Sequence, residues 1–229
     1  MKLRVFGTEI YLGLGAVFLL AIFALFGFNF LGDVLSVIIF SILAFLCLFI
    51  HEFSHVLAGR MFGIPCRRIT VWFFGMGAHL VSMGKSPKEA FLIGVAGPLT
   101  SFALAAFFLL VLASGLPIPF ALANILSVLV LLNIVLGIFN ILPLFPTDGG
   151  RVAHSVFWFF TKDRVKGIYL AVYLSKILIV VAMLYLVANA ILYGMGFFSL
   201  LWYGFIAWFL WSAGTAELRM AKAGMPPYN

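Results

Sequence analysis

Three ionisable side chains, those of His51, Glu52 and His55, lie within a long apolar stretch of the sequence. On an α-helix, residues four positions apart share one face and lie about 6 Å apart along the axis, so both imidazoles can bind one metal ion. Glu52 points about 100° around the helix, where it can reach a water on that metal without being a ligand. This is the chemistry of the His-Glu-x-x-His zinc motif. The alternative is a hydrogen-bonded histidine pair beside a neutralised glutamate, which is costly without a cation.

A catalytic zinc ion needs a third protein ligand, and Asp148 is the best candidate among the remaining acids. Pro143 and Pro146 interrupt the preceding helix and two glycines follow the aspartate. Non-helical backbone is tolerated at membrane depth where it lines a cavity, and it could deliver the carboxylate. The alternative is a turn aspartate that caps a helix beginning near Gly149. In the topology that the basic residues predict, Asp33 lies on the opposite side of the membrane from the metal site, so it is not expected to be a ligand. Four other acids are next to basic residues and are expected to be solvated: Glu9, Glu89, Asp163 and Glu217.

The composition is that of an integral membrane protein, since 65% of the 229 residues are hydrophobic and only 9% are charged. Soluble domains carry about 25% charged residues. Each apolar run is near the roughly 20 residues that cross a bilayer as a helix. We therefore predict one all-α polytopic domain, residues 1–229, with six transmembrane helices at about 11–31, 35–59, 89–113, 120–142, 167–193 and 197–216.

The basic residues predict the orientation of these spans. All 14 lysines and arginines except Lys176 fall on one side of the six predicted spans. By the positive-inside rule this side is cytoplasmic, so both termini are cytoplasmic in a multi-pass protein of the cell membrane. The net charge of +7 is thus explained by topology and lipid headgroups, and no nucleic-acid partner is expected. His51 precedes Arg60 by nine residues, which puts the metal site about 13 Å inside the cytoplasmic boundary.

The segment from Cys66 to Gly84 differs from the spans, because it is rich in β-branched and aromatic residues and is broken by glycines. We predict one or two short strands there, forming a β-hairpin. A transmembrane substrate must unwind before its peptide bonds can be reached, and the edge of the 69–81 strand region could receive the extended chain by strand addition. Gly75 and Gly77 of this segment are the candidate substrate-binding residues beside it.

Two motifs together carry a resemblance to a known family. The His51-Glu52-x-x-His55 motif in a span is followed by Asn140-x-x-Pro143-x-x-Pro146-x-Asp148-Gly149-Gly150, and Ala96-Gly97-Pro98 lies between them. The sequence resembles the site-2 protease family of intramembrane metalloproteases, in its compact prokaryotic form without PDZ or CBS domains. The resemblance implies that His51, His55 and Asp148 bind one zinc ion per chain and that Glu52 is the general base. It also implies that Asn140 holds the substrate or the oxyanion.

The expected function is hydrolysis of a peptide bond within or near the transmembrane segment of a membrane-anchored protein. The expected partners are that substrate and the lipid bilayer, and the sequence does not determine an oligomeric state. One alternative is a membrane zinc protease of the prenyl-protein endopeptidase type, whose third ligand is a glutamate on a later helix. Another is a zinc transporter, which needs polar residues along a path across the membrane, and the third, fifth and sixth spans offer almost none.

Overall fold

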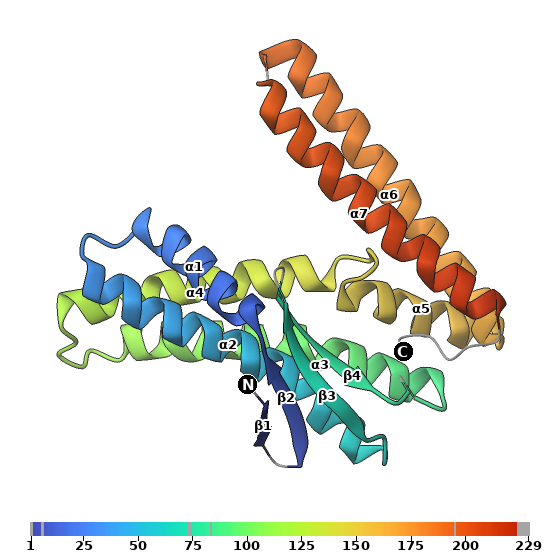
Figure 1. The fold of residues 1–229 in the computed structure, drawn as a ribbon, viewed down its shortest axis with the longest axis horizontal. Coiled ribbons are helices and arrows are strands. Elements are labelled where there is room, and N and C mark those ends of the chain that lie inside the picture. Colours follow the sequence, from blue (N-terminus) through green and yellow to red (C-terminus); the bar gives the residue numbers. More distant parts are fainter. Residues whose placement is uncertain (1, 6, 73–74, 83, 195, 224–229) are drawn as a thin grey trace. The chain divides into compact units, whose positions relative to one another are not determined.

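The computed structural model describes residues 2–5, 7–72, 75–82, 84–194 and 196–223. Within these residues the chain forms seven helices and four strands (Figure 1). In chain order they are β1 (Lys2–Val5), β2 (Thr8–Leu12), α1 (Leu14–Phe28), α2 (Val34–Met61), β3 (Cys66–Trp72), β4 (Gly75–Leu80), α3 (Pro87–Ala113), α4 (Phe120–Ile141), α5 (Asp148–Thr161), α6 (Arg164–Tyr193) and α7 (Phe197–Lys222).

The chain divides into two compact units. The first holds the four strands, α1, α2, the part of α3 from Ala96 onwards and α4 through Asn140. The second holds the start of α3 through Val95 and the helices α5, α6 and α7. Each unit has a hydrophobic core of its own.

The first unit contains a four-stranded sheet in the order β1-β2-β3-β4 (Figure 1). β2 and β3 are parallel and are joined through α1 and α2, whereas the two outer pairs are antiparallel. Ile10, Ile69 and Ala78 are opposite one another across three strands, and the two isoleucines are buried in the core of the unit. The sheet is therefore held against the helices through one apolar face.

Helix α2 carries the histidine motif and is fixed at both ends. Asp33 caps its start, because the carboxylate accepts a hydrogen bond from the Ser36 N–H at 2.8 Å. After its last residue, Gly63 takes a positive φ of 69° and the chain turns toward β3. The buried residues recur with helical spacing and form one stripe: Ser36, Val37, Phe40, Ser41, Ala44, Cys47, Leu48, His51, His55, Val56 and Gly59. Both histidines thus lie on the buried face of α2.

In the second unit, α5 begins after the irregular segment that ends α4. The predicted break at the two prolines is confirmed, because α4 ends at Ile141 and α5 starts at Asp148. The Thr147 hydroxyl bonds the carbonyls of Leu142 and Leu144 at 2.8 and 2.7 Å. A Cβ at Gly149 would collide with the carbonyl oxygen of Leu142, so only glycine permits this close return of the chain.

Four of the described helices are long and apolar enough to cross a membrane, namely α2, α3, α4 and α6. Their bounds agree with four of the six predicted spans to within three residues. Helix α1 is apolar but has only 15 residues, about 22 Å of helix. The prediction that the first span begins near residue 11 is wrong, because residues 8–12 form strand β2.

The predicted all-α fold with one hairpin is also wrong in part. The hairpin near 66–84 exists as β3 and β4, although residues 73, 74 and 83 are outside the described part. It belongs to a larger sheet that includes the two N-terminal strands. In β2 the exposed Glu9 lies between the buried Thr8 and Ile10, and this alternation is too short to stand out beside the long apolar run that follows.

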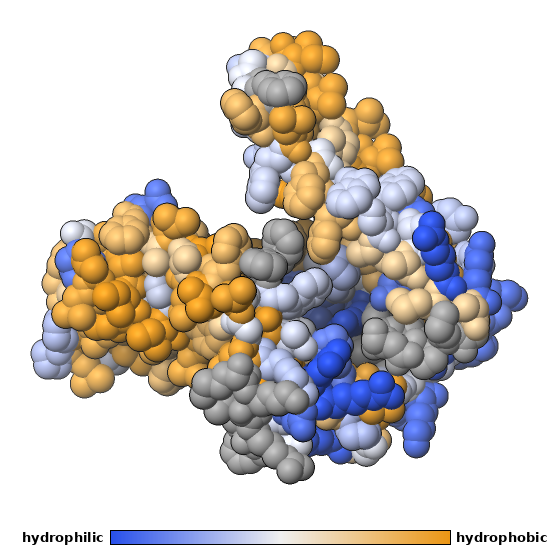
Figure 2. Space-filling model, in the orientation of Figure 1, coloured by the Kyte–Doolittle hydropathy of each residue, from blue (hydrophilic) through white to orange (hydrophobic). Residues whose placement is uncertain are grey.

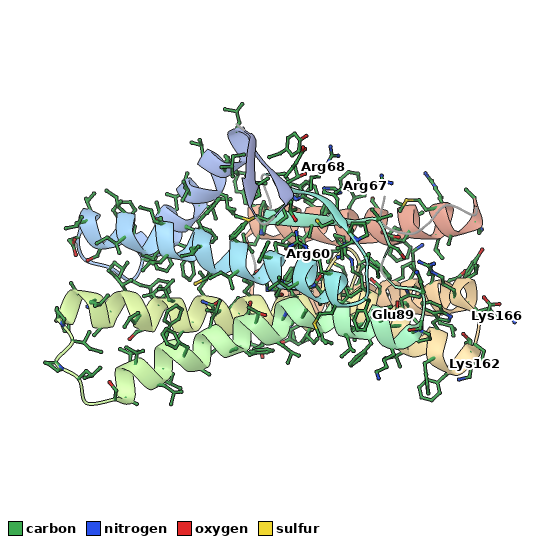
Figure 3. All side chains as sticks on the ribbon, turned by 90° about the horizontal axis from the view of Figure 1, so that it is seen from below. Arg60, Arg67, Arg68, Glu89, Lys162 and Lys166 are labelled. Carbon is green, nitrogen blue, oxygen red and sulfur yellow. The ribbon has the colours of Figure 1, made fainter. Side chains whose placement is uncertain are left out.

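The surface of the first unit has an apolar end and a basic end. Figure 2 shows hydrophobic residues over the end formed by α1, α2 and α4, where Leu25, Val34 and Leu35 are exposed. Figure 3 shows Arg60, Arg67 and Arg68 at the other end, where α2 finishes and β3 begins. Large exposed apolar surfaces of this kind are typical of contact with lipid.

Candidate metal centre

His51 and His55 lie next to each other on α2 in the first unit. Each is only 1% exposed, and the ring centroids are 5.4 Å apart with the planes at 75°. A Cβ built on Gly97 of α3 would overlap the Nε2 atoms of both rings. The two Nε2 atoms therefore converge on one small space beside Gly97, which is the arrangement that two zinc-binding imidazoles require.

In the sequence, Gly97 is part of the Ala96-Gly97-Pro98 motif that contributes to the family resemblance, and no separate role is predicted for it. The structure explains its presence, because any side chain at this position would occupy the space in front of both nitrogens. The residues present thus fit a metal ion held by two histidines. The donor type and the small space left by a missing side chain both support this.

Ser101 is a candidate functional residue that no sequence pattern indicated. Its hydroxyl lies 2.8 Å from Nδ1 of His51, and both residues are buried. In the tautomer that binds a metal through Nε2, Nδ1 carries the proton and donates it to the serine oxygen. Ser101 follows Gly97 by four residues, so one face of α3 both clears the metal space and orients a ligand. The spacing was visible in the sequence, but its contact with α2 was not.

Glu52 is half-buried on α2 and reaches the sheet of the first unit. Its Oε2 accepts a hydrogen bond of 3.1 Å from the main-chain N–H of Ala78 in β4. The glutamate therefore lies beside the histidine pair along the helix while its carboxylate contacts an edge strand. This contact also was not predicted.

Asp148 belongs to the second unit and is 7% exposed. It is the first residue of α5, and Thr147 occupies the N-cap position. The capping alternative for Asp148 is therefore wrong. One carboxylate oxygen lies 3.7 Å from the Arg151 guanidinium, which is one turn further along the helix.

Most of the other acids have local structural roles. The carboxylates of Asp33 and Asp163 cap α2 and α6, and Glu89 accepts a hydrogen bond from the main-chain N–H of Lys85 at 2.8 Å. Glu9 accepts one from the Tyr11 hydroxyl at 2.9 Å. The expectation that Glu217 is solvated is wrong, because its Oε2 is buried without a hydrogen-bond partner among the described residues.

The remaining predicted site residues lie in the first unit. Asn140, near the end of α4, is half-buried, and its amide donates to the carbonyl of Leu136 in its own helix at 3.0 Å. Gly75 begins β4 with a φ of +146°, which favours glycine, and Gly77 lies within the strand. Their contact with a substrate stays a prediction.

Two polar residues of the second unit had no role assigned from the sequence. His154 is buried, stacks on Trp158 with 5.8 Å between centroids, and has Nε2 3.3 Å from the carbonyl oxygen of Arg164. Burial lowers the pKa of His154 to about 4, so the ring is neutral and packed as part of the core. The Lys176 ammonium lies over the Trp211 ring, 4.6 Å from its centre, a cation–π contact between α6 and α7.

An apolar, multi-helix chain with a buried histidine pair and an adjacent glutamate has the features of a membrane metallopeptidase. Residues 39–124 and 117–184 match the model of Peptidase family M50. The chain therefore belongs to Peptidase family M50, and the predicted resemblance to the site-2 proteases is confirmed.

Several known proteins are similar to this chain. "Putative zinc metalloprotease Rip3" of Mycobacterium tuberculosis is 34% identical over 173 residues, which are 73% of this chain and 42% of the relative. "Putative zinc metalloprotease sll0528" of Synechocystis is 34% identical over 134 residues, 58% of this chain and 35% of the relative. "Zinc metalloprotease MJ0392" of Methanocaldococcus jannaschii is 32% identical over 140 residues, 61% of this chain and 40% of the relative. The chain thus spans about two fifths of the length of these curated relatives.

One solved structure has the same fold. The "Site-2 Protease from Methanocaldococcus jannaschii" aligns with a TM-score of 0.61 and 24% identity, over 95% of this chain and 94% of that one. At this identity the match supports the fold and leaves the chemistry to be argued from the residues.

Proposed function

We propose that the protein is an intramembrane zinc metalloprotease that hydrolyses a peptide bond within or near the transmembrane segment of a membrane-anchored substrate. The observation that carries the proposal is the convergence of the His51 and His55 Nε2 atoms on one space beside Gly97, in a chain of a peptidase family. The names of the similar proteins, which call them zinc metalloproteases, support zinc as the metal.

The proposed ligands are Nε2 of His51, Nε2 of His55 and a carboxylate oxygen of Asp148. The assignment of Asp148 as the third ligand is supported by the burial of this residue. Four other acids accept hydrogen bonds from residues close to them in the sequence, namely Asp33, Asp163, Glu89 and Glu9. When bound, zinc would lower the pKa of a water molecule to about 7 and polarise the scissile carbonyl. Two neutral imidazoles and one carboxylate leave the site a net positive charge, which favours hydroxide.

Glu52 is the proposed general base. It takes a proton from the attacking water and passes it to the amine that leaves, which is the work of a positioned carboxylate close to the reacting atoms. Asn140 is proposed to donate an amide N–H to the substrate backbone or to the developing oxyanion. Its amide nitrogen carries two N–H groups, and one of them bonds the carbonyl of Leu136.

The substrate is proposed to bind as an added strand. A transmembrane helix hides its carbonyls in its own hydrogen bonds, so the segment to be cut must first become extended. β4 pairs on one side with β3 and is the last strand in the order of the described sheet. Its other edge can pair with an extended chain. Gly75 and Gly77 are the proposed contacts, because residues without a Cβ let another backbone approach closely.

The proposed topology has six spans with both termini in the cytoplasm. α2, α3, α4 and α6 meet the length and hydropathy of a span by themselves, and α1 and α7 are added by the proposal. The basic ends of α2 and β3 support a cytoplasmic position for the sheet. The metal site is then within the bilayer, nearer to the cytoplasm.

Cleavage of a model membrane helix by the purified protein in liposomes tests the proposal. We expect cleavage that a zinc chelator abolishes and added zinc restores. Glu52→Gln, which preserves shape but removes the base, should bind zinc and be inactive. Cleavage that persists after complete removal of the metal would contradict the proposal, and wild-type cleavage by Glu52→Gln would remove Glu52 as the base.

A further inference from the structure

The contact between Glu52 and Ala78 joins the proposed base to the edge of the sheet. Ala78 faces Ile69 of β3 in the register of the hairpin, yet its N–H donates to Glu52 Oε2 at 3.1 Å. Main-chain groups alternate between the two sides of a strand, so this N–H belongs to the edge that points away from β3. The Glu52 carboxylate therefore accepts a hydrogen bond from an N–H group that does not take part in the pairing of β4 with β3.

The backbone of β4 is a rigid place from which to hold a side chain. Ala78 packs against the hydrophobic core of the first unit, and Leu80, two residues further on, is buried. On α2, Gly59 follows Glu52 by seven residues and so shares its face, and a Cβ there would press on Leu80. Helix and strand are thus in direct contact at two points of this face, one apolar and one polar.

A glutamate side chain has three rotatable bonds and loses considerable freedom when it is held in one geometry. A carboxylate has two oxygens, so one can accept the N–H of Ala78 while the other accepts a proton from water. A hydrogen bond to a charged group contributes enough to select one orientation of the carboxylate.

We infer that the main-chain N–H of Ala78 is a positioning group for Glu52, and that β4 orients the catalytic base as well as presenting an edge to the substrate. This inference rests on the proposed function, because it assigns Glu52 the role of base. The inference adds to the proposed function a main-chain donor that orients the base. Loss of this donor should therefore slow the chemical step without removing the metal or the substrate edge.

The test replaces the N–H itself. Lactic acid incorporated in place of Ala78 converts the amide to an ester and keeps the methyl side chain. We expect kcat to fall by about ten- to a hundredfold, since a hydrogen bond to a charged group is lost, with KM and zinc content unchanged. The corresponding hydroxy acid at Met76, on the same edge of β4 two residues earlier, removes an N–H that faces the proposed substrate strand and not Glu52. It is the comparison variant, and it should raise KM while kcat stays near wild type.

Equal kcat values for the two ester variants would overturn the inference. So would a rise in KM or a loss of zinc in the ester variant at 78 with kcat unchanged, because a group that acts through Glu52 affects the chemical step. Activity of Glu52→Gln alone would instead reject the proposed base. The two failures are therefore distinguishable.

Discussion

Gly97→Ala adds one methyl group at the point where the two histidines converge. The new Cβ would lie far inside van der Waals contact with Nε2 of both His51 and His55. Neither ring can turn aside easily, because both are 1% exposed and Ser101 holds His51 through Nδ1 at 2.8 Å. Forcing an extra carbon into a packed site costs about 1–3 kcal/mol, or roughly five- to 150-fold in an equilibrium constant. We expect zinc affinity to fall by at least this factor, because the added carbon also stands where the metal would bind.

Competition with a chromophoric chelator measures this affinity, and circular dichroism checks the fold. Replacing glycine by alanine inside a helix stabilises the helix by up to about 1 kcal/mol, so the variant should stay folded. Gly204→Ala on α7 is the matched control, since a Cβ there would meet no described atom within 4 Å. Its zinc affinity and activity should equal those of the wild type. Wild-type zinc affinity in Gly97→Ala would refute the inference that both nitrogens face this space.

Three further predictions concern single side chains. Ser101→Ala should weaken zinc binding about ten- to a hundredfold by freeing the His51 ring, whereas Ser127→Ala, whose hydroxyl bonds its own helix, should not; equal affinities would exclude Ser101 as the orienting group. Asn140→Ala should retain zinc and lose most turnover in the cleavage assay, and a normal kcat would remove Asn140 from the mechanism. The pKa of His154 is lowered from 6.5 to about 4 by burial, so the unfolded chain binds a proton that the native protein does not, and stability is lost as pH falls from 6.5 toward 4. At pH 5 the loss is about 2 kcal/mol relative to neutral pH, measurable by denaturant unfolding in detergent micelles; His154→Phe should remove this slope, and an unchanged slope would contradict the assignment.

The elements that bear long, uniform patterns could be predicted from the sequence. The apolar runs of α2, α3, α4 and α6 are long enough for composition alone to locate them. The histidine pair was found because its spacing is local to one helix. The break before Asp148 was found because proline and glycine act on their own backbone.

The contacts between elements could not be predicted in the same way. Gly97 and Ser101 are an ordinary glycine and serine in an apolar run until α3 packs against His51 and His55. The donor at Ala78 is a main-chain group and leaves no trace in the residue type. Strands β1 and β2 are short, and the parallel pairing of β2 with β3 joins residues far apart in sequence.

The most direct test of the central claim is the zinc content of purified Asp148→Asn beside wild type and Glu52→Gln. The claim is that two residues of α2 and the carboxylate at the start of α5 hold one metal ion, while Glu52 acts on water. It predicts about one zinc ion per chain in wild type and in Glu52→Gln, and far less in Asp148→Asn after dialysis against a weak chelator. Full retention of zinc by folded Asp148→Asn, with wild-type affinity, would contradict it.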